Sequence, residues 1–240
     1  MGKPDRKEIK CYARCVLKNR HAVLAGITLL LTVLNLALSS LSMMAAPSGN
    51  GILSALIYLG FSLLVNIIYY ILLAGLYRIY LDICENRAFR WTDLFSMFTE
   101  HPEPVAIYSV LQFIVTYVFM QVGLWWLDVM IEWLFYGQSG FPLLATVTVL
   151  LAAVLFVCLE ISFSMTLFVH ADDPYLSFKE MMQQSWSLMD GMRLSYLFMQ
   201  LSFIGMYLLG ILSFGIGFLF VEPYVYTTKG YFFKKIISPA

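Results

Sequence analysis

The sequence predicts an all-α membrane protein, a single bundle of about six transmembrane helices with short amphipathic helices at one membrane surface. The chain of 240 residues is 60% hydrophobic and only 12% charged, whereas a soluble domain carries about 25% charged residues. Its apolar residues gather in six stretches, and a bilayer span needs about 20 such residues. Its basic residues are confined to four segments of the chain.

The six apolar stretches are the expected spans. They cover residues 22–44, 52–77, 105–127, 142–169, 194–212 and 214–232. The first follows a basic segment, as in a signal peptide, but its length of about 23 residues exceeds the usual 7–15. We therefore expect an uncleaved first span. The last two stretches meet at Ser213 in a glycine-rich run, which fits a tight helical hairpin or a re-entrant pair, and we favour two spans.

The basic residues indicate the orientation, because Lys and Arg concentrate in cytoplasmic loops. All fifteen lie within residues 3–20, 78–90, 179–193 and 229–235. None lies in the alternating connections, residues 45–51, 128–141 and the turn at Ser213. We thus expect six spans with both termini in the cytoplasm. The chain then forms one membrane domain over residues 1–240, divided into a basic amphipathic segment (1–21), the bundle (22–232) and a tail (233–240).

Three of the cytoplasmic segments have the pattern of amphipathic helices that lie at a membrane surface. In residues 7–17 the apolar face is Ile9, Tyr12, Ala13, Val16 and Leu17. In residues 92–98, Thr92 is the expected cap and the apolar stripe is Leu94, Phe95 and Phe98. In residues 177–189, Ser177 and Glu180 form a capping box. Each segment precedes two spans, which suggests a threefold repeat of surface helix and helix hairpin.

Polar residues inside a bilayer are costly and are treated as functional hypotheses. Four lie near mid-depth on the expected spans: Asn35, Asn66, Glu160 and Glu222. They could form a shared site for a proton, a cation or a substrate. Alternatively, they are structural, with neutral acids hydrogen-bonded to neighbouring helices, since no Lys or Arg is expected at that depth. Small residues near the end of the chain are candidate helix-packing positions: Ser202, Gly205, Gly210, Gly215 and Gly217.

The sequence does not predict an enzyme. Residues 137–140 (Gly-Gln-Ser-Gly) are similar to a string found in rhomboid proteases, but all three histidines map to the opposite side of the membrane from Ser139. A serine nucleophile needs a base within reach, so a turn is the favoured interpretation. Cys11 and Cys15 lie one helical turn apart without further ligands, which is a poor metal pattern. We expect no metal and no cofactor, and the zero net charge argues against nucleic acid as a partner.

Several short motifs resemble an uncharacterised bacterial membrane family known as domain of unknown function 975. They are residues 171–174 (Ala-Asp-Asp-Pro), 185–191 (Ser-Trp-Ser-Leu-Met-Asp-Gly), 201–205 (Leu-Ser-Phe-Ile-Gly), 215–217 (Gly-Ile-Gly) and 223–224 (Pro-Tyr), with weaker matches at 13–19 and 94–98. Two departures are the absence of a Gly and a Trp around Asn19 and the presence of Met206 after Gly205. The resemblance implies a bacterial plasma-membrane protein and no catalytic residues.

These observations favour a non-enzymatic membrane accessory, scaffold or lipid-interacting protein. Its expected partners are membrane lipids, with another membrane protein or a second copy of the chain as further candidates. The alternative is a small permease or substrate-binding subunit that uses the mid-membrane polar residues.

Overall fold

The computed structural model describes residues 6–18, 20–45, 51–136 and 142–237, which fold almost entirely into helices. Five helical segments are long and apolar enough to cross a membrane: His21–Leu41, Ile52–Cys84, Glu103–Phe135, Leu143–Asp172 and Arg193–Leu212. The chain therefore has an all-α fold with several candidate membrane spans, as its composition predicts.

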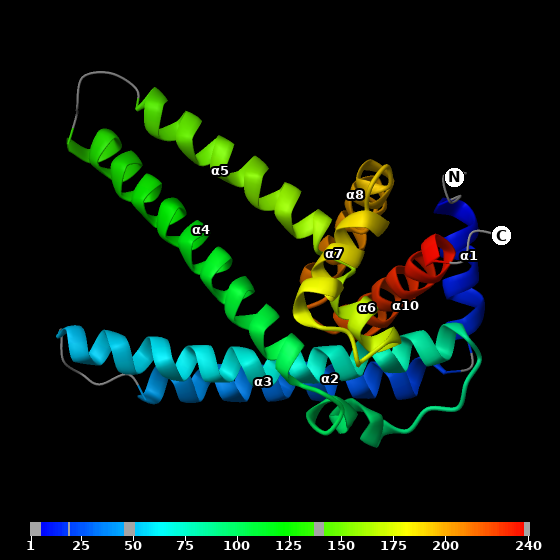
Figure 1. Cartoon of the computed structure of the whole chain (residues 1–240). Helices are drawn as coiled ribbons and strands as arrows, with labels where there is room; N and C mark the ends of the chain where they lie inside the picture. Colours follow the sequence, from blue (N-terminus) through cyan, green and yellow to red (C-terminus); the bar gives the residue numbers. More distant parts are fainter. Residues whose placement is uncertain (1–5, 19, 46–50, 137–141, 238–240) are drawn as a thin grey trace.

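Two long hairpins form the first part of the fold. α2 (His21–Ala45) is followed by α3 (Ile52–Cys84), and α4 (Glu103–Tyr136) by α5 (Leu143–Ser162), which resumes after a short break as α6 (Thr166–Asp172). α4 contacts α3 where α4 begins. From there the two hairpins diverge, so that the last turns of α2 and α4 lie far apart (Figure 1).

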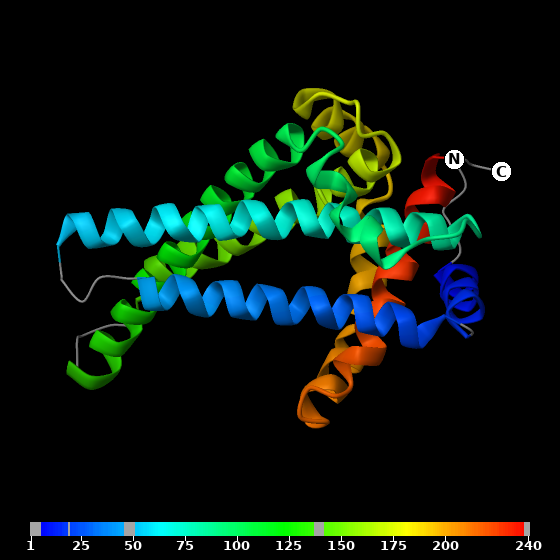
Figure 2. The same cartoon turned by 90° about the horizontal axis from the view of Figure 1, so that it is seen from below.

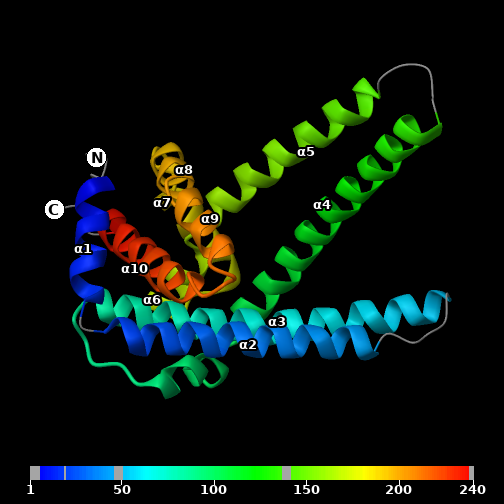
Figure 3. The same ribbon diagram turned by 180° about the vertical axis from the view of Figure 1, so that it is seen from behind.

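A third, shorter hairpin consists of α8 (Arg193–Leu201) and α9 (Ile204–Leu212) on one side and α10 (Phe218–Ile237) on the other. It leaves the body of the molecule in a third direction (Figures 2 and 3). The turn before α10 has positive φ angles at Phe214 (53°) and Gly215 (90°), so the sixth expected stretch starts as a turn and becomes helical only at Phe218. α10 is not among the five apolar segments, because it carries four charged residues: Glu222, Lys229, Lys234 and Lys235.

Two helices continue well beyond their apolar stretches. α3 runs seven residues past Tyr77, and α4 runs nine past Leu127 through residues expected in an outer connection. In both places the hydropathy of the sequence falls, but the residues still favour a helix, so the helix ends later than its apolar stretch. Arg78, the first charged residue of α3, forms an ion pair with Glu100 rather than ending the helix.

The expected apolar face of α1 (Arg6–Leu17) is confirmed. Ile9, Ala13 and Leu17 are buried, and α1 packs on α10. The Tyr12 ring stacks on Tyr231 with centroids 3.8 Å apart, and its hydroxyl donates to the carbonyl oxygen of Cys84 at 2.8 Å. α1 thus covers its apolar face with protein and leaves its basic face exposed.

The second short helix differs from the expected pattern. It is a 3₁₀-helix, η1 (Trp91–Phe98), in which Leu94 and Met97 are buried while Phe95 and Phe98 are exposed. A 3₁₀-helix repeats every three residues, so the buried face follows a spacing of three instead of the α-helical stripe. Thr92 is not the cap, because the backbone N–H of Arg90 donates to the Asp93 carboxylate at 2.6 Å.

η1 approaches α3 very closely at one glycine. A β-carbon at Gly75 would lie 2.1 Å from the carbonyl oxygen of Leu94. Only a residue without a side chain allows this approach of two backbones. Gly75 therefore fixes where η1 docks.

The third short helix, α7 (Phe178–Leu188), has the predicted capping box. The backbone N–H of Glu180 donates to the Ser177 hydroxyl at 3.4 Å, and the backbone N–H of Ser177 donates to the Glu180 carboxylate at 2.9 Å. Gly191 follows with φ of 72°, so the chain turns there before α8. Met181 and Met189 are buried, whereas Trp186 is exposed and lies under the guanidinium of Arg193.

The packed core lies at one end of the molecule. We call this end the base; it contains α1, the last part of α3, α6 and the last part of α10 (Figure 1). In α3, burial is continuous over most of residues 71–84, but Val65 is the only buried residue before them. The far parts of the hairpins expose apolar side chains, as expected for helices in contact with lipid.

Ion pairs join the segments that meet at the base. The Lys234 ammonium lies 2.6 Å from the Glu85 carboxylate and 2.5 Å from the Asp172 carboxylate, which follow α3 and end α6, respectively. Lys235 lies 2.7 Å from Glu8 of α1. These contacts bring together three of the four basic segments of the sequence, residues 6–18, 78–90 and 229–235, at one end of the structure.

Candidate intramembrane polar site

The four polar residues expected at mid-depth lie on four different helices, and each lines a cavity. Asn35 is on α2, Asn66 on α3, Glu160 on α5 and Glu222 on α10. They do not converge on one point. Three adjoining cavities separate them.

The first cavity lies between α2, α3 and α10 and has a volume of about 150 Å³. Asn35 and Glu222 face it together with two threonines and two tyrosines: Thr28, Thr32, Tyr69 and Tyr226. The volume corresponds to about five water molecules at liquid density. It is a small polar chamber around the Glu222 carboxylate.

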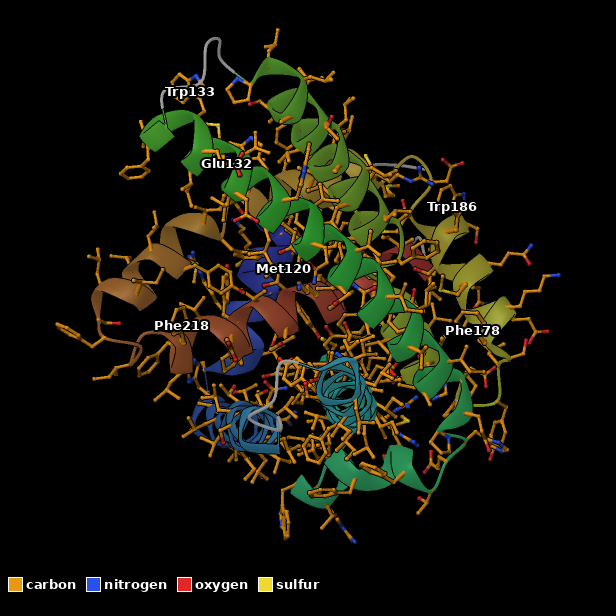
Figure 4. The ribbon with its side chains drawn as sticks, turned by 90° about the vertical axis from the view of Figure 1, so that its left-hand side faces the viewer. Met120, Glu132, Trp133, Phe178, Trp186 and Phe218 are labelled. Carbon is orange, nitrogen blue, oxygen red and sulfur yellow. The ribbon has the colours of Figure 1, made fainter. Side chains whose placement is uncertain are left out.

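The second cavity, which we call the central cleft, is the largest at about 730 Å³ and lies between α2, α3 and α4. No charged side chain of the described residues lines it. Most of its lining residues carry an amide, a hydroxyl or a phenol: Asn35, Ser39, Tyr58, Ser62, Asn66, Tyr69, Tyr70, Gln112, Thr116, Tyr117 and Gln121. Tyr117, Met120 and Leu124 at its edge are also substantially exposed, so the central cleft opens to the surroundings. Figure 4 shows the molecule from the hairpin ends, with Met120 on α4 above the α2–α3 hairpin.

The third cavity has a volume of about 400 Å³ and is lined by α3, α4, α5, α8 and α10. The side-chain amide of Gln112 donates a hydrogen bond to the Glu160 carboxylate. Gln200 donates to the hydroxyl of Tyr196 at 2.7 Å. Lys229 also lines this cavity, and its ammonium lies 5.8 Å from the centre of the Tyr226 ring. Lys229 comes from α10, which crosses the fold obliquely.

Shared residues join the three cavities into a row. Asn35 and Tyr69 line both the first cavity and the central cleft, and Tyr70 and Gln112 line both the central cleft and the third cavity. The row runs from Glu222 at one end to Glu160 at the other. The predicted residues thus lie along three neighbouring cavities that share lining residues.

Sequence reasoning missed most of the tyrosines and glutamines of this region. A signal was present, because polar residues recur on one helix face within the apolar stretches. On α3 the spacing of Tyr58, Ser62, Asn66 and Tyr70 is four residues, and the polar residues of α2 follow a similar pattern: Thr28, Thr32, Asn35 and Ser39. Residues three and four apart lie on one face of a helix.

The expected packing residues have different surroundings. A β-carbon at Gly217 would lie 2.7 Å from the α-carbon of Gly210, and one at Gly210 would lie 2.7 Å from the Phe218 ring. These two glycines allow the tight α9–α10 turn. A β-carbon at Gly205 would meet nothing within 4 Å, so Gly205 makes no close approach. Ser202 accepts a hydrogen bond from Lys10 at 2.6 Å and links α1 to the α8–α9 junction.

The remaining chemical candidates are dispersed. Ser139 lies outside the described residues. Cys11 and Cys15 are both exposed on α1. Within the ranges that the structure describes, no group of three or more His, Cys, Asp or Glu side chains could hold a metal ion.

Comparison with known proteins identifies a family. A family model described as protein of unknown function (DUF975) matches residues 1–240. No curated protein matches the chain. No solved structure matches it either.

Proposed function

This chain belongs to the DUF975 family of proteins of unknown function, and we propose that it is a non-enzymatic, lipid-interacting protein of the bacterial plasma membrane. In this proposal the central cleft holds an amphiphile taken from the bilayer. An accessory or scaffold role toward another membrane protein is compatible with such binding.

The proposed topology has six spans with both termini in the cytoplasm. The positive-inside rule supports it, together with the gathering of ion-paired basic segments at the base. α10 is the proposed sixth span, because its 20 residues extend about 30 Å and its lysines lie toward the base. Its first turn lies beside the start of α2, where Phe220 stacks on His21, so this span is the least supported by the packing. The order of short helix followed by hairpin occurs three times along the chain, which supports the threefold repeat.

The observation that carries the proposed function is the chemistry of the central cleft. Its edge is apolar and exposed on helices that would contact lipid, while its walls are uncharged but rich in hydrogen-bonding groups. The Oδ1 atom of Asn66 is buried and has no hydrogen-bond partner among the residues that the structure describes. An unpaired buried acceptor costs about 1–3 kcal/mol, which a hydroxyl of a bound molecule would offset. An uncharged polar head with an apolar tail fits both features.

Filling the central cleft is expected to remove the bound amphiphile. Ser62→Trp or Thr116→Trp places an indole among the lining residues, and we expect either variant to retain about tenfold less uncharged lipid per protein after purification, equivalent to about 1.4 kcal/mol. The measurement is mass spectrometry of lipids extracted from protein purified in a mild detergent.

The matched control is Leu151→Trp on α5. The Leu151 side chain is 66% exposed and lines none of the three cavities. It should retain lipid like the wild type. Equal retention in the filled variants, or no uncharged lipid on the wild type, would contradict binding in the central cleft.

A second candidate function, a small permease, is favoured by the row of cavities between Glu222 and Glu160. If this row carries protons or a proton-coupled substrate, Glu160→Gln and Glu222→Gln should each reduce the acidification of reconstituted vesicles to the rate of protein-free vesicles. Glu132→Gln, at the far end of α4 (Figure 4), should leave the rate unchanged. Wild-type vesicles that acidify no faster than empty ones would exclude proton transport under these conditions.

A further inference from the structure

A separate groove lies at the base, where the end of α1 and the start of α2 face α9 and α10. We call it the basic groove. Its volume is about 460 Å³. Arg14, Lys18 and His21 line one side, and Met206, Phe220 and Tyr224 line the other. Figure 3 shows α1 beside α10 at this end of the molecule. It shares no residue with the three cavities of the polar region.

The charge of the basic groove is not neutralised by the protein. No acidic residue lines it, and Arg14 and Lys18 form no ion pair among the described residues. The Arg14 guanidinium lies 5.9 Å from the centre of the Tyr224 ring, and the His21 ring stacks on Phe220 at 5.2 Å. By contrast, Lys235 near the same helix is paired with Glu8. The groove therefore carries at least two free positive charges over aromatic surfaces.

The position of the groove matches a membrane boundary. His21 is the first residue of α2 and of the first candidate span. The N-terminus of a helix carries a partial positive charge from its aligned peptide dipoles, which adds to the charge of the side chains. Phe220 is 60% exposed, so the groove is basic on one side and presents an apolar surface on the other.

We propose that the basic groove binds an anionic phospholipid of the cytoplasmic leaflet. The phosphate group would lie between Arg14 and Lys18, and the acyl chains would follow Phe220 and Met206 toward the bilayer. Clusters of basic residues between helices on the cytoplasmic side are suited to anionic headgroups, and the apolar wall favours a lipid over a free anion. The inference rests on the cytoplasmic side proposed above for α1 and for the start of α2, and on neither the central cleft nor a spanning α10.

Native mass spectrometry of the full-length protein in detergent tests this proposal, with phosphatidylglycerol and phosphatidylcholine as the two probes. The wild type should bind phosphatidylglycerol more tightly. The double variant Arg14→Gln/Lys18→Gln should weaken phosphatidylglycerol binding by about 30-fold, from the contribution expected of two basic residues near an anionic surface, and leave phosphatidylcholine binding unchanged.

The control is Lys7→Gln/Lys179→Gln, which removes the same charge from exposed positions on α1 and α7 that do not line the groove. It should bind phosphatidylglycerol within about threefold of the wild type. An equal loss in the control would show diffuse charge attraction and overturn the proposal. So would displacement of phosphatidylglycerol by inorganic phosphate at an equal concentration, since a free anion would then be the occupant.

Variants of the central cleft separate the two proposals. Ser62→Trp should bind phosphatidylglycerol like the wild type, because the basic groove and the central cleft share no lining residue. The basic-groove proposal is therefore tested by its own variants and by the competition with inorganic phosphate, whatever the outcome for uncharged lipids.

Discussion

Replacing Gly75 by alanine is expected to destabilise the protein by about 2–3 kcal/mol, the upper part of the range for overpacked positions. The added β-carbon would lie 2.1 Å from the carbonyl oxygen of Leu94 and 2.8 Å from its carbonyl carbon. Both atoms belong to the backbone, so the contact cannot be relieved by rotating a side chain. α3 and η1 must separate, and Leu94 and Met97 lose their buried positions.

The measurement is the melting temperature in detergent, where a loss of this size lowers the midpoint by about 5–10 °C for a chain of this length. Gly60→Ala is the matched control on the same helix, because a β-carbon there meets nothing within 4 Å. Alanine also has the higher helix propensity by up to about 1 kcal/mol, so Gly60→Ala should be neutral or stabilising. A Gly75→Ala variant with an unchanged midpoint would show that η1 does not dock on α3 in this way.

Replacing Lys234 by methionine is expected to destabilise the base by about 1–3 kcal/mol. The substitution leaves the Glu85 and Asp172 carboxylates near each other without the ammonium that lies between them. Removing one member of a fully buried pair costs about 3–5 kcal/mol. The value here is reduced because the three side chains remain 21–36% exposed and exposed pairs contribute little.

The pH dependence of this effect has a definite sign. Burial alone lowers the pKa of Lys234, but its hydrogen bonds to the Asp172 and Glu85 carboxylates outweigh burial and raise the pKa above the ordinary value of 10.5. A raised lysine pKa contributes stability that is complete below 10.5 and is lost as the pH rises through the higher value in the folded protein. The difference in melting temperature between wild type and Lys234→Met should therefore be constant at neutral pH and shrink in strongly alkaline buffer.

Lys235→Met provides the comparison, because Lys235 pairs with the more exposed Glu8. It should change the melting temperature far less than Lys234→Met. Equal effects of the two substitutions would contradict a special role for the Lys234 site.

Local patterns were sufficient to predict the individual helices. The apolar faces of α1 and the capping box of α7 involve residues close together in the sequence, and the structure confirms them. The pattern of η1 predicts an α-helix, because eight residues are too few to distinguish the α-helical repeat of 3.6 residues from the 3₁₀ repeat of three. The ends of α3 and α4 were placed too early because hydropathy marks the apolar part of a helix and not its last hydrogen-bonded turn.

Relations between helices could not be predicted from one sequence. Gln112 and Glu160 are 48 residues apart and meet only because α4 and α5 form a hairpin. Lys229 reaches the cavity of Glu160 because α10 crosses α3 obliquely, and no periodicity encodes a crossing angle. The four mid-depth residues were recognised from the cost of burying polar groups in lipid, but their arrangement along a row of cavities follows from the divergence of the hairpins.

The divergence of the hairpins from a single packed end also has a consequence for the surrounding bilayer. In the proposed topology the protein is narrow and closely packed in the cytoplasmic leaflet and wide and loosely packed in the outer leaflet, where lipids must fill the space between its arms. Such a body is a cone rather than a cylinder. Its fit to the membrane then depends on curvature and on the shapes of the neighbouring lipids.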